Sequence, residues 1–125
     1  MPTSDVSIVW TPDQQSLLFV FPPMLTQAAA EEAIDQWTSA LDKREEETTL
    51  IWDCSEMKDY DPTARILWQK ALSKQQKKIK SIWLISESKV IRMAAKLLAM
   101  FVKLKIRPVS SPTEIPAIPS LARPA

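Results

Sequence analysis

At 125 residues, with 46% hydrophobic and 25% charged side chains, the chain is long enough to bury the core of one globular domain. It has no histidine and no glycine, which excludes a histidine base or metal ligand and every glycine-rich phosphate-binding loop. The net charge of +1 hides an asymmetry: residues 1–63 carry three basic and thirteen acidic side chains, whereas residues 64–107 carry twelve basic and one acidic.

Three further features limit the class of protein. No apolar run approaches the roughly 20 residues that a membrane-spanning helix requires. The first residues, MPTSDVSIVW, have neither the basic start nor the apolar core of a secretion signal, so we expect a cytoplasmic protein. The single cysteine, Cys54, can form neither an internal disulfide nor a cysteine-cluster metal site, and its position on an apolar strand indicates a core residue.

The first third of the chain predicts a β-hairpin and a helix. Residues 7–10 and 16–21 have strand composition, and residues 11–15 between them have turn composition. Because glycine and asparagine are absent, we expect the turns to use right-handed backbone geometry. Thr26 is expected to cap the helix. The apolar residues of this helix recur at helical spacing: Ala30, Ala33, Ile34, Trp37 and Leu41.

The middle of the chain predicts a strand, a loop and a second helix. Residues 48–54 are β-rich and are expected to form a central strand, followed by a loop over residues 55–60. Asp61 and Pro62 are typical of an N-cap and a first helical position. The apolar residues of this second helix share one face: Ala64, Leu67, Trp68, Ala71 and Leu72.

The last third predicts another strand, a third helix and an edge strand. Residues 79–85 are expected to form the strand, and residues 89–103 a helix that is apolar nearly all round. One stripe of cations interrupts its apolar surface: Lys89, Arg92, Lys96 and Lys103. Residues 105–109 predict an edge strand interrupted by proline, and residues 111–114 match a capping box that can start a short helix.

The element order ββαβαβαβ predicts a single α/β domain over residues 1–115, followed by a loose proline-rich tail over residues 116–125. We expect a mostly parallel sheet with an antiparallel hairpin at its start and helices packed on it.

The segment IWDCSEMKDYDPTAR, residues 51–65, resembles the STAS domain, which is the fold of bacterial anti-sigma-factor antagonists. In that family a strand ends in Asp-x-Ser-Gly, and about four residues later Asp-Ser-Ser-Gly opens a helix. Asp53 and Ser55 match the first motif, and Asp61 matches the second aspartate. Pro62 stands where the family has its phosphorylated serine, and Thr63 occupies the next position.

Two other departures concern the glycines of both motifs, which are Glu56 and Ala64 here. The segment is also similar to a looser group of bacterial SpoIIAA-like proteins, which share this fold with CRAL-TRIO lipid carriers. The resemblance implies a non-enzymatic regulatory or scaffold domain that binds a protein partner, without the usual phosphoserine switch and without a cofactor.

We expect the partner to be a protein, with an acidic surface as one option, and expect neither nucleic-acid binding nor stable membrane insertion. A homodimer through the Trp10 hairpin is compatible with the sequence. The expected partner-binding residues come from the loop, the start of the second helix and the basic stripe: Asp53, Ser55, Asp59, Tyr60, Asp61, Thr63, Arg65, Lys89, Arg92, Lys96 and Lys103.

Two alternatives stay open at this point. The first is a small lipid- or hydrophobic-ligand-binding domain of the CRAL-TRIO kind, in which the helix over residues 90–104 covers an apolar pocket. The second is a metal-dependent enzyme that uses Asp53, Asp59 and Asp61. The plainer interpretation is that Asp61 caps a helix, Asp53 satisfies loop amides and Asp59 is exposed. In this interpretation Arg65 pairs with Asp61, and the cationic stripe is only the wet face of a core helix.

Overall fold

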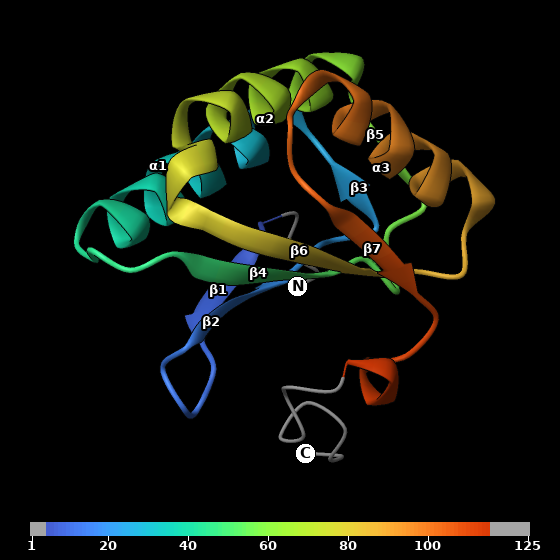
Figure 1. Cartoon of the computed structure of the whole chain (residues 1–125). Coiled ribbons are helices and arrows are strands. Elements are labelled where there is room, and N and C mark those ends of the chain that lie inside the picture. Colours follow the sequence, from blue (N-terminus) through green and yellow to red (C-terminus); the bar gives the residue numbers. More distant parts are fainter. Residues whose placement is uncertain (1–4, 116–125) are drawn as a thin grey trace.

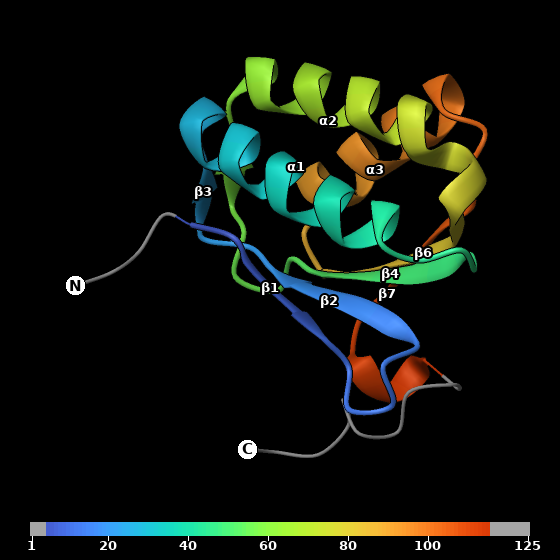
Figure 2. The ribbon, with the colours of Figure 1, turned by 90° about the vertical axis from the view of Figure 1, so that its left-hand side faces the viewer.

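The computed structural model describes residues 5–115 and shows a five-stranded sheet with three helices on one face (Figures 1 and 2). The strand order is β1-β2-β4-β6-β7; β1 and β2 are antiparallel, and the other neighbours are parallel. The strands are β1 (Ser7–Trp10), β2 (Ser16–Val20), β4 (Thr48–Asp53), β6 (Ile79–Ile85) and β7 (Ile106–Val109). The helices are α1 (Gln27–Asp42), α2 (Pro62–Gln75) and α3 (Lys89–Phe101).

This architecture confirms the predicted α/β fold with its mostly parallel sheet. Three short elements were not predicted: the parallel pair β3 (Met24–Leu25) and β5 (Asp59–Tyr60), and a 3₁₀ turn, η1 (Gln76–Lys78), after α2. The third helix ends at Phe101, so the expected end at Lys103 is wrong. The capping box forms a 3₁₀ turn, η2 (Pro112–Glu114), in which the Glu114 carboxylate accepts from the Ser110 and Ser111 amides. The expected loose tail over residues 116–125 lies outside the described residues.

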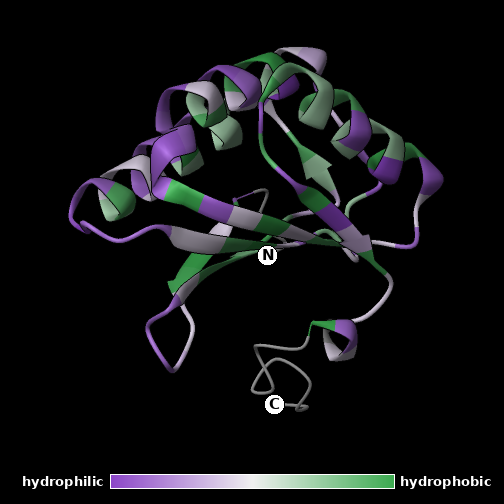
Figure 3. Ribbon diagram, viewed as in Figure 1, coloured by the Kyte–Doolittle hydropathy of each residue, from purple (hydrophilic) through white to green (hydrophobic). Residues whose placement is uncertain are grey.

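A cluster of five aromatic side chains fills the space between the sheet and the helices. Each ring centroid in the cluster lies 5.4–6.5 Å from at least two others, and none of these side chains is more than 4% exposed. The members are Phe19, Phe21, Trp37, Trp52 and Trp68. They come from β2 and the residue after it, α1, β4 and α2, so this cluster joins the sheet to two of its three helices. The helices in Figure 3 accordingly alternate between hydrophilic and hydrophobic residues.

The opposite face of the sheet carries no α-helix in the described part of the chain, only the short 3₁₀ turn η2 (Figure 2). Ile51, Ile85 and Val109 are buried there, and Ile115 after η2 packs against them. The guanidinium of Arg107 lies 5.4 Å from the ring centroid of Trp83 on the neighbouring strand. This smaller apolar layer is therefore covered in part by the segment that follows β7.

The β1–β2 hairpin turns on a left-handed residue, which the sequence analysis did not expect. Gln14 has a φ of 59°, so the expectation that all turns are right-handed is wrong. Asp13 supports the turn because its carboxylate accepts hydrogen bonds from the Thr11 hydroxyl (2.6 Å) and the Gln15 amide (3.0 Å). These two hydrogen bonds, the Thr11 bond foremost, lower the pKa of the Asp13 carboxyl.

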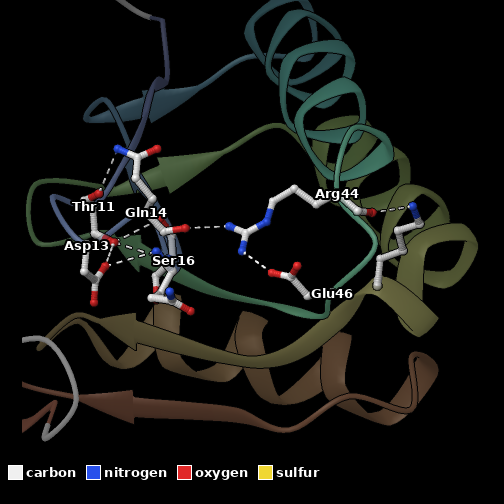
Figure 4. A network of polar contacts seen from close by, with 8 residues as sticks. Thr11, Asp13, Gln14, Ser16, Arg44 and Glu46 are labelled. Atoms are coloured by element: carbon white, nitrogen blue, oxygen red, sulfur yellow. Dashed lines mark hydrogen bonds and ion pairs between the residues drawn. The ribbon is translucent and has the colours of Figure 1, made fainter.

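Arg44 anchors the same hairpin to the end of α1 (Figure 4). Its guanidinium donates to the Gln14 carbonyl (2.6 Å), pairs with Glu46 (2.9 Å) and stacks 4.8 Å from the ring centroid of Trp10. Trp10 is therefore half-buried beneath a cation and packs against the main core. The dimer contact proposed for this hairpin stays a prediction.

We predict that Gln14→Gly stabilises the protein by up to about 1 kcal/mol, because glycine occupies the left-handed region without the steric cost of a Cβ atom. Urea unfolding followed by tryptophan fluorescence measures this as a higher midpoint with an unchanged slope. Gln15→Gly is the matched control: Gln15 is exposed in the same turn with a negative φ, so the substitution is expected to give no gain. Equal gains for both variants would contradict the assignment of strain to Gln14.

Candidate functional site

The carboxyl edge of the parallel strands brings together the segments that carried the family resemblance. Strand β4 ends at Asp53, whose carboxylate accepts from the Ser55 amide (3.1 Å) and the Ser55 hydroxyl (2.6 Å). The Cys54 amide continues the pairing with β6 by donating to the Ile85 carbonyl (2.9 Å). Asp53 and Ser55 thus shape the loop that leaves the sheet, as the plainer interpretation expected.

Asp61 begins α2 as predicted, but its side chain stabilises a different helix. It occupies the N-cap position of α2 without a side-chain bond to that helix. Its carboxylate instead accepts a 3.0 Å hydrogen bond from the Gln27 amide at the start of α1, where Thr26 also caps by accepting from Ala29. The prediction that the Asp61 carboxylate caps its own helix is therefore wrong, and the side chain connects the amino-terminal ends of α1 and α2.

The three carboxylates proposed as a metal site each accept hydrogen bonds from a different part of the backbone. Asp53 holds its own loop, Asp61 holds α1, and exposed Asp59 accepts from the adjacent Tyr60 amide (2.8 Å). Among residues 5–115, no three acidic or cysteine side chains lie close enough together to bind a metal ion. The geometry therefore gives the metal-dependent alternative no support.

The side chains of Thr63 and Arg65 have no hydrogen bond or ion pair among residues 5–115, and the same holds for the Tyr60 hydroxyl. Thr63 is exposed in the first turn of α2. Arg65 is half-buried on the flank of α2 that faces α3, and the pairing considered with Asp61 does not form. Both are available to a partner.

A small apolar cavity lies between the sheet, α2 and α3. Its volume is about 50 Å³, and Tyr60, Arg65 and Ala94 are among the residues that line it. Ligand pockets for drug-sized molecules are typically about 300–1,000 Å³, so this cavity is too small for a lipid. A larger depression of about 480 Å³ between α1 and α2 is open and is lined by five charged side chains: Glu31, Asp35, Asp42, Lys70 and Lys74. Neither feature favours the lipid-carrier alternative.

Helix α3 carries the most unusual surface of the described chain. Nine large hydrophobic side chains are exposed between residues 5 and 115, and five of them lie on this one helix. They are Val90, Met93, Leu97, Met100 and Phe101. The sequence predicted a helix that is apolar nearly all round, but the exposure of its apolar side chains was not predicted. The sequence does contain a signal for it, since an apolar arc that is wider than the buried face of a helix must reach solvent.

The cationic stripe divides into free and engaged groups. Lys89, Lys96 and Lys103 are exposed and have no hydrogen bond or ion pair within the described residues. Arg92 instead donates to the Ser86 carbonyl (2.7 Å) and the Ser110 hydroxyl (3.0 Å), which ties α3 to the end of β7. The stripe therefore presents three lysines to solvent, while its arginine holds the helix in place.

No helix among the described residues is both long enough and apolar enough to cross a membrane.

Comparisons with known proteins agree on the fold. A family model described as SpoIIAA-like matches residues 18–117. The solved structure of an uncharacterized DUF3478-family protein from Shewanella loihica PV-4, described as having a SpoIIAA-like fold, is similar with a TM-score of 0.71. The two are 20% identical, over 93% of this chain and 91% of that chain, so this likeness shows the fold alone. No curated protein matches.

We predict that Cys54 does not react with a disulfide reagent such as DTNB in the native protein. Its side chain is 1% exposed, and burial, with a smaller contribution from the charge of Asp53, raises the pKa of its thiol. Labelling should therefore require unfolding and appear only as urea is added. Rapid labelling without denaturant would contradict the buried position.

We predict that Asp61→Ala lowers the free energy of unfolding by about 1 kcal/mol, because the Gln27 amide at the start of α1 loses its acceptor. Asp59→Ala is the control, since that carboxylate bonds only to the adjacent amide and its loss should cost less than about 0.5 kcal/mol. Urea unfolding of both variants measures the difference. An equal loss for both would show that the bond to α1 contributes nothing.

Proposed function

Since the chain belongs to the SpoIIAA-like family, we propose that it is a non-enzymatic regulatory domain that binds a protein partner. The observation that carries the proposal is the exposed apolar face of α3 beside lysines that have no ion pair within residues 5–115. Clustered exposed hydrophobic side chains of this size typically mark an interaction site in a soluble domain. We refer to the exposed residues of this helix, with Lys89 and Lys96, as the α3 face.

The start of α2 supports the same function and adds a second edge to the surface. Thr63 and Arg65 lie there without a hydrogen bond or ion pair to any described residue, and Arg65 and Ala94 line one cavity, so this edge adjoins the α3 face. Asp53, Ser55 and Asp61 act behind them by shaping the loop and the helix starts. The proposed surface therefore needs Thr63, Arg65 and the lysines for contact and the aspartates for position.

Regulation by a phosphoserine at the family's usual place has no chemical basis in this chain. Pro62 fills that position and has no hydroxyl group. The neighbouring Thr63 is exposed, but it lies one residue further into the helix. We propose that the partner is bound constitutively, with affinity set by the apolar and cationic groups of the surface.

We predict that Arg65→Glu and the double change Lys89→Glu with Lys96→Glu each weaken partner binding by roughly tenfold or more, since each reverses charge at the proposed contact. Affinity capture from the source organism with quantitative mass spectrometry identifies proteins retained in stoichiometric amount by the unmodified chain. The retained protein is then purified and titrated against both variants.

Lys80→Glu supplies the control for this experiment, because Lys80 is exposed at the start of β6 and lies outside the proposed surface. Its variant should bind as the unmodified chain does. If no protein is retained in stoichiometric amount, or if all variants bind the partner equally, the proposed function is wrong.

A further inference from the structure

We propose that the α3 face pairs with a helix of the partner protein, in coiled-coil register, and that this helix carries acidic side chains beside its apolar seam. The inference rests on the proposed function in taking the chain to be a binding domain. It deepens that proposal by naming the chemistry of what is bound.

The exposed apolar residues have the spacing of a coiled-coil seam. Val90, Met93, Leu97 and Met100 are separated by three, four and three residues, which is the a–d–a–d pattern of two heptads. Their exposed fractions are 57%, 58%, 38% and 79%. Four of the five exposed apolar side chains of α3 lie at a and d, and the fifth, Phe101, lies at the flanking e position. A stripe of this width suits one facing helix better than the plane of a membrane.

The same register assigns the lysines to a single flank of the seam. Lys89 and Lys96 occupy successive g positions, and Lys103 continues the series just beyond the helix. Residues at g lie opposite the flanking residues of the partner helix and select it by charge. Neither α3 nor α2 contains an acidic residue, so nothing on these two helices neutralises the lysines. A partner helix with Glu or Asp at its flanking positions supplies the missing charge.

A second copy of this chain is a poor occupant of the seam. Antiparallel pairing of two α3 helices places the g positions opposite each other, so that lysine faces lysine. Parallel pairing places each lysine opposite an e position, and those positions are Ala94 and Phe101. Neither arrangement forms an ion pair across the seam, which leaves an acidic partner helix as the complementary choice.

The helix is held rigidly enough to serve as a template. Its inner face is buried through Ile91, Ala95 and Leu98, its first turn is capped by Ser88, and Arg92 binds the end of β7. Its 13 residues span about 20 Å at 1.5 Å per residue, which matches two heptads. Because the backbone of α3 is already helical in the free chain, little of its conformational entropy is lost when the partner binds.

The experiment uses two synthetic 21-residue peptides as probes, both with leucine at the a and d positions. One has glutamate at every e and g position, and the other has lysine there, so that like charges keep each peptide from pairing with itself. Labelled peptide is titrated with the full chain at low salt and followed by fluorescence anisotropy. We expect the acidic peptide to bind at least roughly tenfold more tightly than the basic one.

Two variants locate the contact. Val90→Glu should abolish the preference, whereas Val9→Glu should not, because Val9 is similarly exposed (52%) but lies on β1 away from α3. Lys89→Glu with Lys96→Glu should reverse the preference towards the basic peptide. Unfolding midpoints of all variants establish that each one is folded. Equal binding of both peptides, or equal effects of the two valine variants, overturns the proposal.

Two other occupants of the seam would be identified by results that contradict the proposal. A dimer of the chain in sedimentation that dissociates with Val90→Glu assigns the seam to a second copy. Binding to vesicles of phosphatidylserine and phosphatidylcholine that is lost with Val90→Glu, without peptide preference, assigns it to a membrane surface.

If the native partner depends on Arg65 while the peptides show no preference, the proposed function stands and the seam is refuted. If the peptides discriminate but no native protein is retained, the seam stands and the regulatory role is refuted.

Discussion

The aromatic cluster under α1 and α2 is the constraint on which the rest of the structure depends. Phe19, Trp37 and Trp68 contact one another, so the sheet and these two helices form one tightly joined unit. Helix α3 contributes only small and aliphatic side chains to the core, and a residual cavity remains beside it. The aromatic part of the core therefore lies beneath α1 and α2. The third helix packs on the sheet through a narrow inner face, which leaves its outer apolar side chains for other contacts.

In a chain without glycine and asparagine, acidic side chains supply hydrogen-bond acceptors for the amides of turns and loops. Turn and loop amides need acceptors, and short carboxylates beside them supply these. Asp13 closes the hairpin, Asp53 shapes the loop after β4, and Asp61 binds the first amide of α1. The side chains that looked like candidate chemistry in the sequence are therefore satisfied by the backbone. Among residues 5–115 these carboxylates therefore bind separate backbone amides and do not converge on one site.

Local patterns in the sequence predicted the fold well, because strand composition, helical spacing and caps such as Thr26 act over a few residues. The errors concern contacts between distant residues or compensated strain. The bond from Asp61 to Gln27 joins positions 34 residues apart, and the left-handed Gln14 is held by Arg44 from the end of α1. The SpoIIAA-like fold was predicted from the segment around Asp53, whereas the partner-binding residues remain predictions. The exposed face of α3 was missed because periodicity shows which residues share a face, not what covers that face.

The acidic and basic halves of the sequence meet along α1 and α2 but not along α3, and the proposed specificity of the α3 face rests on this difference. Along the α1–α2 boundary, acidic side chains such as Glu31 and Asp35 line the same depression as Lys70 and Lys74, so the two halves of the chain largely balance there. Helix α3 lies on the side of α2 away from α1 (Figure 1). No ion pair to its lysines forms among residues 5–115, and they lie beside the apolar seam. In the proposed complex, apolar burial would provide affinity, while the lysines would favour acidic partner helices and repel basic ones.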